Sequence, residues 1–389
     1  MTDSNRARLS YIGEVTWGVT PGSPDMQEMR ITSESLIKNI QNITSNELRS
    51  DRQVTDLIQV GKDAGGDINF ELSYGSFDDF LQSALFSAAW STAVNISATD
   101  IAAAVTGSKL TSTSTNFITA GIVAGMWIKV AGFTGNTANN RFYRVTSVTS
   151  ANEIVVSPAP AAADASGETV TIKGAYIRNG TTQKSFTIEK GFLDAAEYFR
   201  YTGMVVNNLS LNVEAQQIVT GSVGFIGKDG TLQGTSLDAS PTAANSNEIM
   251  NAIGNVGSIR ENGVEVASPN YIRSISLELA NNLRQQYAVG SDSLIGVGTG
   301  KCDVTGTINT YFGNSDVLDK FYDGTRTSID FRLTDAAGNT YIFDIPEIEF
   351  ESGNATAQGQ DQDVFAEMGF RAMRDPTYGF TIQVCRFPA

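Results

Sequence analysis

The hydrophobic pattern changes period within residues 67–85. Every second residue from 68 to 74 is apolar, which predicts a strand with one dry and one wet face. The wet face is formed by Asp67, Asn69, Glu71 and Ser73. After Gly75 the apolar spacing becomes helical, so a short amphipathic helix is expected to cover the dry face of the strand. Its apolar stripe includes Phe77, Phe80, Leu81 and Leu85.

A weaker copy of this unit follows about 240 residues later. Residues 306–309 (Gly-Thr-Ile-Asn) resemble residues 66–69 (Gly-Asp-Ile-Asn), and the helical stretch that follows turns Leu318 and Phe321 inward. A polar segment precedes each unit, at 46–56 and at 281–292, and we expect both to be tips of long hairpins. Their charged candidates for contacts between assembled subunits are Glu47, Arg49, Asp51, Arg52, Arg284 and Asp292. The repeat predicts a pseudo-duplicated β-rich domain.

Residues 97–177 differ from the rest of the chain. Thr, Ser, Ala and Gly dominate there, short strand-like pieces alternate with turns, and the charges nearly balance. We therefore expect an inserted small all-β barrel or sandwich. Residues 1–25 contain two Pro-containing turns and read as an N-terminal arm. The remaining ranges, 26–96 and 178–389, would form one mainly β core.

Composition narrows the classes of function. The chain has 389 residues, a net charge of −15 and no histidine, so His-based catalytic triads and His-containing zinc sites are excluded. Its two cysteines predict free thiols rather than a disulfide framework. The acid excess disfavours a broad nucleic-acid-binding surface. No apolar run reaches bilayer length and no signal peptide is apparent, so we expect synthesis in a cytoplasm without classical export or membrane contact.

None of the segments that resemble a catalytic or ligand-binding motif has the residues that the motif requires. The glycine-rich segment ending at Lys301 lacks the first Gly of a phosphate loop, has Cys302 where Ser or Thr is needed, and precedes a strand. Residues 361–363 (Asp-Gln-Asp) lack the Gly and closing Glu of a calcium loop. Glu71, Glu214 and Glu278 lie in plain alternating strands, as expected for a solvated strand face. We expect no enzyme activity, cofactor or metal.

The element order resembles that of the tail tube (major tail) proteins of long-tailed bacteriophages. The resemblance covers 26–96 and 178–389. It is carried by the strand–turn–helix at 67–85 and its echo at 304–322, with support from segments 186–192, 203–207 and 375–379. The segment with Asn139-Asn140-Arg141-Phe142 resembles a small β-module grafted onto several phage structural proteins.

The resemblance implies two packed antiparallel sheets with flanking short helices. It also implies that six copies form a ring and that rings stack into the hollow tail tube of a virion, through which the genome passes on ejection. Implied partners are further copies of the chain and other tail proteins, such as tape-measure and tail-terminator or tip proteins. Long loops and terminal arms would join ring to ring.

Physical reasoning agrees, because closing a ring pairs sheet edges that otherwise invite aggregation. The expected channel lining is Asp67, Asn69, Glu71, Ser73, Glu214 and Glu278. An acidic wall would repel the DNA backbone during transit instead of binding it. The alternative function is a β-rich decoration or adhesin protein that binds host-surface carbohydrate, with Trp127, Phe142 and Tyr143 as a stacking platform. A carboxylate-based glycosidase is disfavoured, because no motif marks an acid pair.

Overall fold

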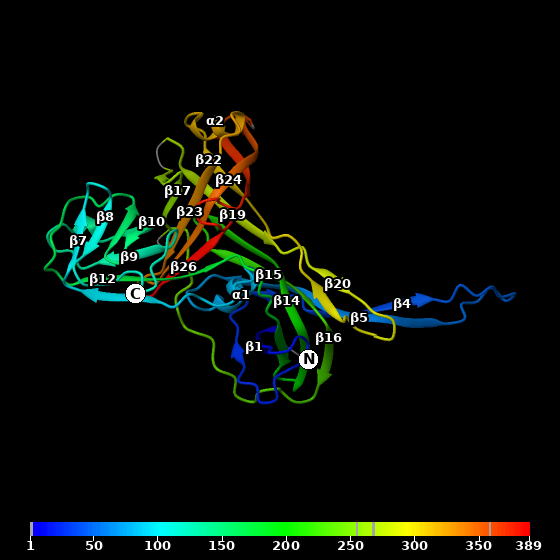
Figure 1. Ribbon diagram of the computed structural model, residues 1–389. Helices are drawn as coiled ribbons and strands as arrows, with labels where there is room; N and C mark the ends of the chain where they lie inside the picture. Colours follow the sequence, from blue (N-terminus) through cyan, green and yellow to red (C-terminus); the bar gives the residue numbers. More distant parts are fainter. Residues whose placement is uncertain (1–2, 254–255, 267–268, 358) are drawn as a thin grey trace.

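The computed structural model describes residues 3–253, 256–266, 269–357 and 359–389, and it is mainly β (Figure 1). Its first half contains η1 (Ser4–Arg6), β1 (Ala7–Gly13), β2 (Gln27–Glu28), β3 (Ser33–Glu34), β4 (Ile37–Thr44), β5 (Leu57–Glu71), α1 (Asp78–Ala84), β13 (Phe186–Phe192), β14 (Glu197–Glu214), β15 (Thr220–Gly227) and β16 (Asp229–Gln233). The second half contains β17 (Val256–Glu261), β18 (Val264–Glu265), β19 (Ile272–Ala280), β20 (Arg284–Gln286), β21 (Gly296–Gly298), β22 (Asp303–Tyr311), α2 (Asp316–Tyr322), β23 (Thr327–Thr334), β24 (Thr340–Thr356), β25 (Phe365–Ala372) and β26 (Gln383–Phe387). Between α1 and β13 lie β6 (Val94–Ala98), β7 (Ile101–Ala104), β8 (Lys109–Ser112), β9 (Trp127–Ala131), η2 (Thr137–Asn139), β10 (Phe142–Ser150), β11 (Glu153–Ser157) and β12 (Val170–Arg178).

The two halves repeat the same strand pairings, which confirms the predicted duplication. Strand β1 pairs with β13 as β17 pairs with β23, and β4 pairs with β5 as β19 pairs with β22. The pairs β5–β15, β13–β14, β14–β15 and β14–β16 likewise recur as β22–β25, β23–β24, β24–β25 and β24–β26.

The irregularities of the ladders recur as well. The β14–β15 ladder shifts register between Val206 and Asn208, and the β24–β25 ladder shifts between Phe350 and Ser352. Both shifts lie at the centre of a long strand that leaves one sheet and enters another. Because bulges redirect strands, their recurrence shows that each half turns its long strand by the same device.

The long strands β14 and β24 divide the pairing network into a central sheet and two outer sheets. The central sheet runs β4–β5–β15–β14–β19–β22–β25–β24 and is antiparallel throughout. One outer sheet runs β2–β1–β13–β14–β16, and the other runs β17–β23–β24–β26–β12. One hydrophobic cluster links apolar residues from all three sheets and both helices, as in a β-sandwich.

Part of the predicted N-terminal arm is a strand of an outer sheet. Residues 7–13 form β1, which pairs with β13 along its whole length, and Leu9 and Tyr11 are buried. The polar start of the segment and its Pro-containing turns suggested an arm. The short apolar alternation of β1 becomes interpretable only beside β13.

The segment between α1 and β13 has a hydrophobic core of its own. Seventeen buried residues between Val94 and Ile172 form a cluster separate from the main one. The predicted division at 97 and 177 stays a prediction, although β12 continues from this segment into an outer sheet, where it pairs with β26. Figure 1 places this segment at one end of the molecule and the β4–β5 hairpin at the other.

A buried ionic and aromatic junction joins the inserted segment to the core. Arg144 of β10 lies 3.2 Å from Asp344 of β24, whose side chain is almost fully buried. Burial raises the pKa of Asp344 to about 6, against the opposing effect of the Arg144 charge. Trp127 packs with Cys385 and Phe387 of β26 in a small apolar cluster. The insert is therefore docked on the core through desolvated groups.

Candidate functional site

One face of the central sheet is polar across the strands of both halves. In a single row across the sheet, successive paired residues are Asn69, Ser222, Ser210, Glu278, Thr305 and Arg371. Side chains alternate between faces along a strand, so the neighbouring residues point to the opposite, dry face. Those include Phe70, Leu211 and Leu277, each at most 3% exposed. We call the wet side the polar face.

The polar face gathers most of the acidic residues selected from the sequence. Asp67 and Glu278 are exposed, and Glu71 and Glu214 are half-buried. Glu367 of β25 lies on the same face, opposite Asn309 and Asn354; it was not selected from the sequence, although the alternation of apolar and other residues over 366–371 could have marked it. Among the residues that the structure describes, none of these five carboxylates has an ion-pair partner. The face thus carries uncompensated negative charge.

Two basic side chains on or beside this face, Arg371 and Lys301, are engaged by acids. Arg371 pairs with Asp303 at 3.4 Å and with Glu351. Lys301 lies 2.7 Å from Asp303, and its hydrogen bond holds the pKa of that carboxyl below the usual value. A polyanion that approached this face would therefore meet free carboxylates and two cations already neutralised by neighbours, besides the exposed Arg273, which stacks over the Phe365 ring at 4.9 Å.

Ser73 does not belong to the polar face. Strand β5 ends at Glu71, and the Ser73 side chain is fully buried, with its Oγ 2.6 Å from the Ser76 Oγ. In the sequence, polar and apolar residues go on alternating past the end of β5, because the turn before α1 has a polar residue, Ser73, at the next alternate position. The prediction that Ser73 lines a channel is wrong for this reason.

Helix α1 covers the dry face of the central sheet. Phe77, Phe80, Leu81 and Leu85 are each at most 2% exposed. The Phe80 ring lies 4.6 Å from that of Tyr11. The N-terminal end of α1 is tied to the second half, because Tyr341 Oη and Arg386 both contact the Asp78 carboxylate.

Helix α2, the counterpart of α1, is less covered. Leu318 is 6% exposed and is the buried residue of this helix, whereas Phe321 is only partly buried against the core. Tyr322 is 75% exposed. Helices α1 and α2 have equal length and matching positions but differ in burial. The second half therefore exposes apolar surface around α2 that the chain itself does not cover.

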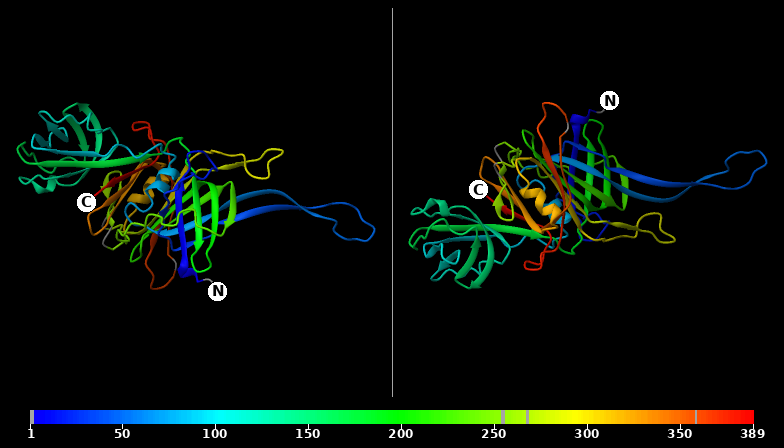
Figure 2. Two further views of the ribbon diagram at one scale, coloured as in Figure 1. Left: turned by 90° about the horizontal axis from the view of Figure 1, so that it is seen from below. Right: turned by 90° about the horizontal axis from the view of Figure 1, so that it is seen from above.

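The β4–β5 hairpin projects far from the body of the molecule (Figure 2). Glu47, Arg49, Asp51 and Arg52 lie at its exposed tip, where Arg49 and Asp51 form an ion pair of 2.7 Å. Apolar residues on the projecting ribbon are also open to solvent, namely Ile37, Ile40, Ile43, Leu48, Val54, Leu57, Ile58 and Val60. A two-stranded ribbon with so much exposed apolar surface is marginally stable alone and indicates a docking element.

The second predicted tip is a shorter excursion that contacts the first hairpin. It contains β20 and β21 and connects β19 with β22, as the first tip connects β4 with β5. Asp292 lies 3.0 Å from Lys62 of β5, and the Lys62 backbone N–H donates to the Asp292 carbonyl oxygen. Arg284 is exposed at the base of this excursion.

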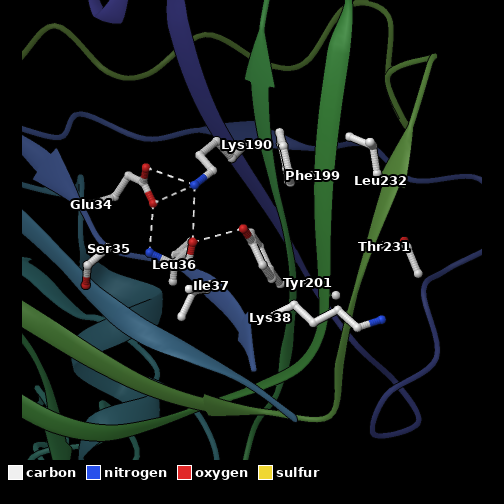
Figure 3. A pocket seen from close by; sticks show the side chains of 11 residues that line it. Glu34, Ser35, Leu36, Ile37, Lys38, Lys190, Phe199, Tyr201, Thr231 and Leu232 are labelled. Atoms are coloured by element: carbon white, nitrogen blue, oxygen red, sulfur yellow. Dashed lines mark hydrogen bonds and ion pairs between the residues drawn. The ribbon is translucent and has the colours of Figure 1, made fainter. Parts of the chain in front are cut away.

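A pocket of about 510 Å³ lies along the outer edge of β3 and β4 (Figure 3). The Lys190 ammonium pairs with Glu34 at 3.1 Å and donates to the Leu36 carbonyl oxygen. The Tyr201 hydroxyl donates to the same carbonyl oxygen at 2.9 Å. These contacts fix the beginning of the β3–β4 edge against the outer sheet, and Ile37 and Leu232 remain exposed at the rim.

The aromatic residues of the carbohydrate alternative do not form an exposed platform. Trp127 and Tyr143 are at most 2% exposed, and Phe142 packs edge-on against Phe387 at 5.0 Å. In the part of the chain that the structure describes, no group of three or more acidic or cysteine side chains is placed to hold a metal ion. None of the described helices has the length and hydropathy to cross a bilayer.

A duplicated antiparallel fold with a projecting hairpin and a polar sheet face is typical of a structural protein that assembles with copies of itself. The comparison with protein families agrees, since residues 4–372 match the phage tail tube protein family. The chain therefore belongs to that family, and it is a structural component of a bacteriophage virion tail. A search of curated proteins finds no match.

Proposed function

We propose that this protein assembles into closed rings that stack into the tail tube, and that the polar face lines the lumen. The single observation behind the proposal is the acidic polar face, which crosses both halves of the chain without interruption. The resemblance noted in the sequence implies sixfold rings, and a closed ring would pair the free edges of the central sheet.

The polar face has the chemistry of a wall that does not retain DNA. Asp67, Glu71, Glu214 and Glu278 would recur around the ring. Protein affinity for DNA comes largely from phosphate neutralisation by Lys and Arg, and the charges here have the opposite sign. The genome would therefore pass during ejection without being bound.

The two hairpin tips are proposed to join successive rings. The exposed apolar ribbon of β4–β5 would be buried against the next ring, and the shorter excursion at 281–300 would brace its base through the Lys62–Asp292 ion pair. We propose the outer surface of the tube for the insert, and further tail proteins, such as tape-measure and terminator or tip proteins, as partners at the lumen and the tube ends.

The test is reagent access in assembled tubes. Glu278→Cys places a thiol on the polar face, and Ser147→Cys places one on an exposed strand of the insert. In the dissociated chain both thiols should react with a small maleimide and with a bulky polyethylene-glycol maleimide.

In tubes, Glu278→Cys should react with the small reagent only, whereas Ser147→Cys should react with both. Equal reaction of the Glu278→Cys thiol with the bulky reagent in intact tubes would place the polar face outside and refute the lumen assignment. Failure of the unmodified chain to form tubes would refute the function itself.

A further inference from the structure

The internal duplication predicts how one chain joins the next. Within the chain, the halves meet where β14, the long strand of the first half, pairs with β19, the first strand that the second half contributes to the central sheet. That ladder pairs Ser210 with Glu278 and Leu211 with Leu277. The matching strand of the second half is β24, and the matching strand of the first half is the continuous β3–β4 segment.

Both matching strands have an open edge. Between Phe350 and Thr356, β24 pairs with β25 on one side, and in the described residues no strand pairs with its other side. Strands β3 and β4 pair with β5 on one side, and again no described strand lies against the other, where the Leu36 carbonyl oxygen accepts from the Lys190 and Tyr201 side chains instead. One chain thus carries one edge of each kind without a strand partner at the two ends of its central sheet, and the junction replaces the side-chain contacts at Leu36 with a strand.

We propose that β24 of one chain pairs antiparallel with β3–β4 of the next in the register of the internal β14–β19 junction. The ladders fix the corresponding positions. Matching β5 with β22 through Ile68 and Ile308 makes Ile37 the counterpart of Glu278. Matching the two bulges makes Asn354 the counterpart of Ser210. Asn354 should therefore lie opposite Ile37 of the neighbouring chain, with Ala355 opposite Leu36.

The incomplete cover of α2 supports this junction independently. The C-terminal end of α1 is held by the second half, since the Asn281 side chain, which directly follows β19, donates to the Ala84 carbonyl oxygen at 3.0 Å. The counterpart of Asn281 is Ile40, which is 51% exposed. The proposed pairing brings Ile40 of the next chain towards the exposed Tyr322 end of α2, so each apolar surface gains cover.

If chains join in this way, the number of chains in a ring differs from the six that the family resemblance implies. This step rests on the proposed tube function. Every chain supplies two equivalent units, so a ring of six units contains three chains rather than six. Three chains place 24 strands around the lumen, which at a spacing of about 4.8 Å and a tilt of about 40° gives about 48 Å between opposite backbones. Six chains would double that width. The narrower barrel already leaves room for a single DNA duplex with side chains on the wall.

The test is a disulfide across the junction, because facing residues in an antiparallel pair have Cα separations that suit the bond. The Ile37→Cys/Asn354→Cys variant should cross-link between chains when tubes are oxidised. On a non-reducing gel the ladder should end at three chains. The matched internal pair, Ser210→Cys/Glu278→Cys, should cross-link within the chain and leave its mass unchanged.

A register control separates this pairing from chance contact. In Ile37→Cys/Ala355→Cys the second thiol points to the opposite face of the sheet, so no ladder is expected. A ladder that continues to six chains, or oxidised tubes without cross-links between chains, would overturn the proposal while leaving the tube function intact. If the double variant does not assemble, helical reconstruction of unmodified tubes decides, since sixfold rings of identical chains contradict the proposal and threefold rings support it.

Discussion

Truncation of Phe80 should destabilise the folded chain strongly. Its side chain is 2% exposed and fills the space between α1, β1, β13 and β15. The ring centroid lies 4.6 Å from Tyr11, 5.0 Å from Phe186 and 5.8 Å from Phe225. Phe→Ala in a core costs about 3–5 kcal/mol, and each favourable aromatic pair contributes about 0.5–1.5 kcal/mol beyond area. We therefore expect Phe80→Ala to lower the free energy of unfolding by about 4–5 kcal/mol.

The measurement is urea unfolding of the dissociated chain, followed by tryptophan fluorescence. Trp90 reports on this region, because its indole N–H donates to the Asp78 carbonyl oxygen at 3.4 Å at the start of α1. The matched control is Tyr322→Ala on α2, where 75% exposure predicts a change within about 0.5 kcal/mol. A loss of unfolding free energy below about 1.5 kcal/mol for Phe80→Ala, or equal losses for the two variants, would refute the conclusion that α1 covers and stabilises the dry face of the central sheet.

Three further outcomes are expected. Replacing residues 46–55 with a two-residue turn should leave the melting temperature of the dissociated chain nearly unchanged and abolish stacking in negative-stain images; normal tubes would contradict the role given to the hairpin. Gly306→Ala would place Cβ 2.3 Å from the Ser276 carbonyl oxygen of the neighbouring strand β19, so we expect about 1–3 kcal/mol of destabilisation in urea, whereas Gly13→Ala, with open space around it, should be neutral. Asp344 has a folded pKa raised from 3.8 to about 6 by burial, so the folded state binds the extra proton and stability from this group falls as pH rises from about 4 to about 6. Asp344→Asn should remove that slope from urea midpoints measured against pH, and identical slopes in the two proteins would show that Asp344 is not the group responsible.

The sequence is informative where a local period persists and silent where pairing is long-range. The alternation at 67–71 and the stripe from Phe77 to Leu85 predicted β5 and α1, because both patterns depend on near neighbours. Ser73 shows the limit, since an alternating pattern cannot mark the residue at which the ladder stops. The partner of β1 was also beyond reach, because 181 positions separate Leu9 from Lys190, the residue that it pairs with in β13 once the chain has folded.

The candidate site was predictable in part. Asp67, Glu71, Glu214 and Glu278 were selected strand by strand, and the ladders place them on one face because β15 and β14 connect β5 to β19 in register. Glu367 was not selected, although apolar and other residues alternate over 366–371 as they do over 67–71, so this signal was available in the sequence. The open edge of β24 could not be predicted from the sequence either, because an edge is recognised only once all strand pairings of the fold are known.

The covalent link between the two halves has a kinetic consequence for assembly. Each association step between free molecules costs about 4–15 kcal/mol in lost translational and rotational freedom. In the proposed ring, a chain that carries two units would form every second junction during folding, at the high effective concentration of a tether. Closure of such a ring would have a lower order in protein concentration, so these chains should nucleate tubes at dilutions where separate single units would remain dispersed.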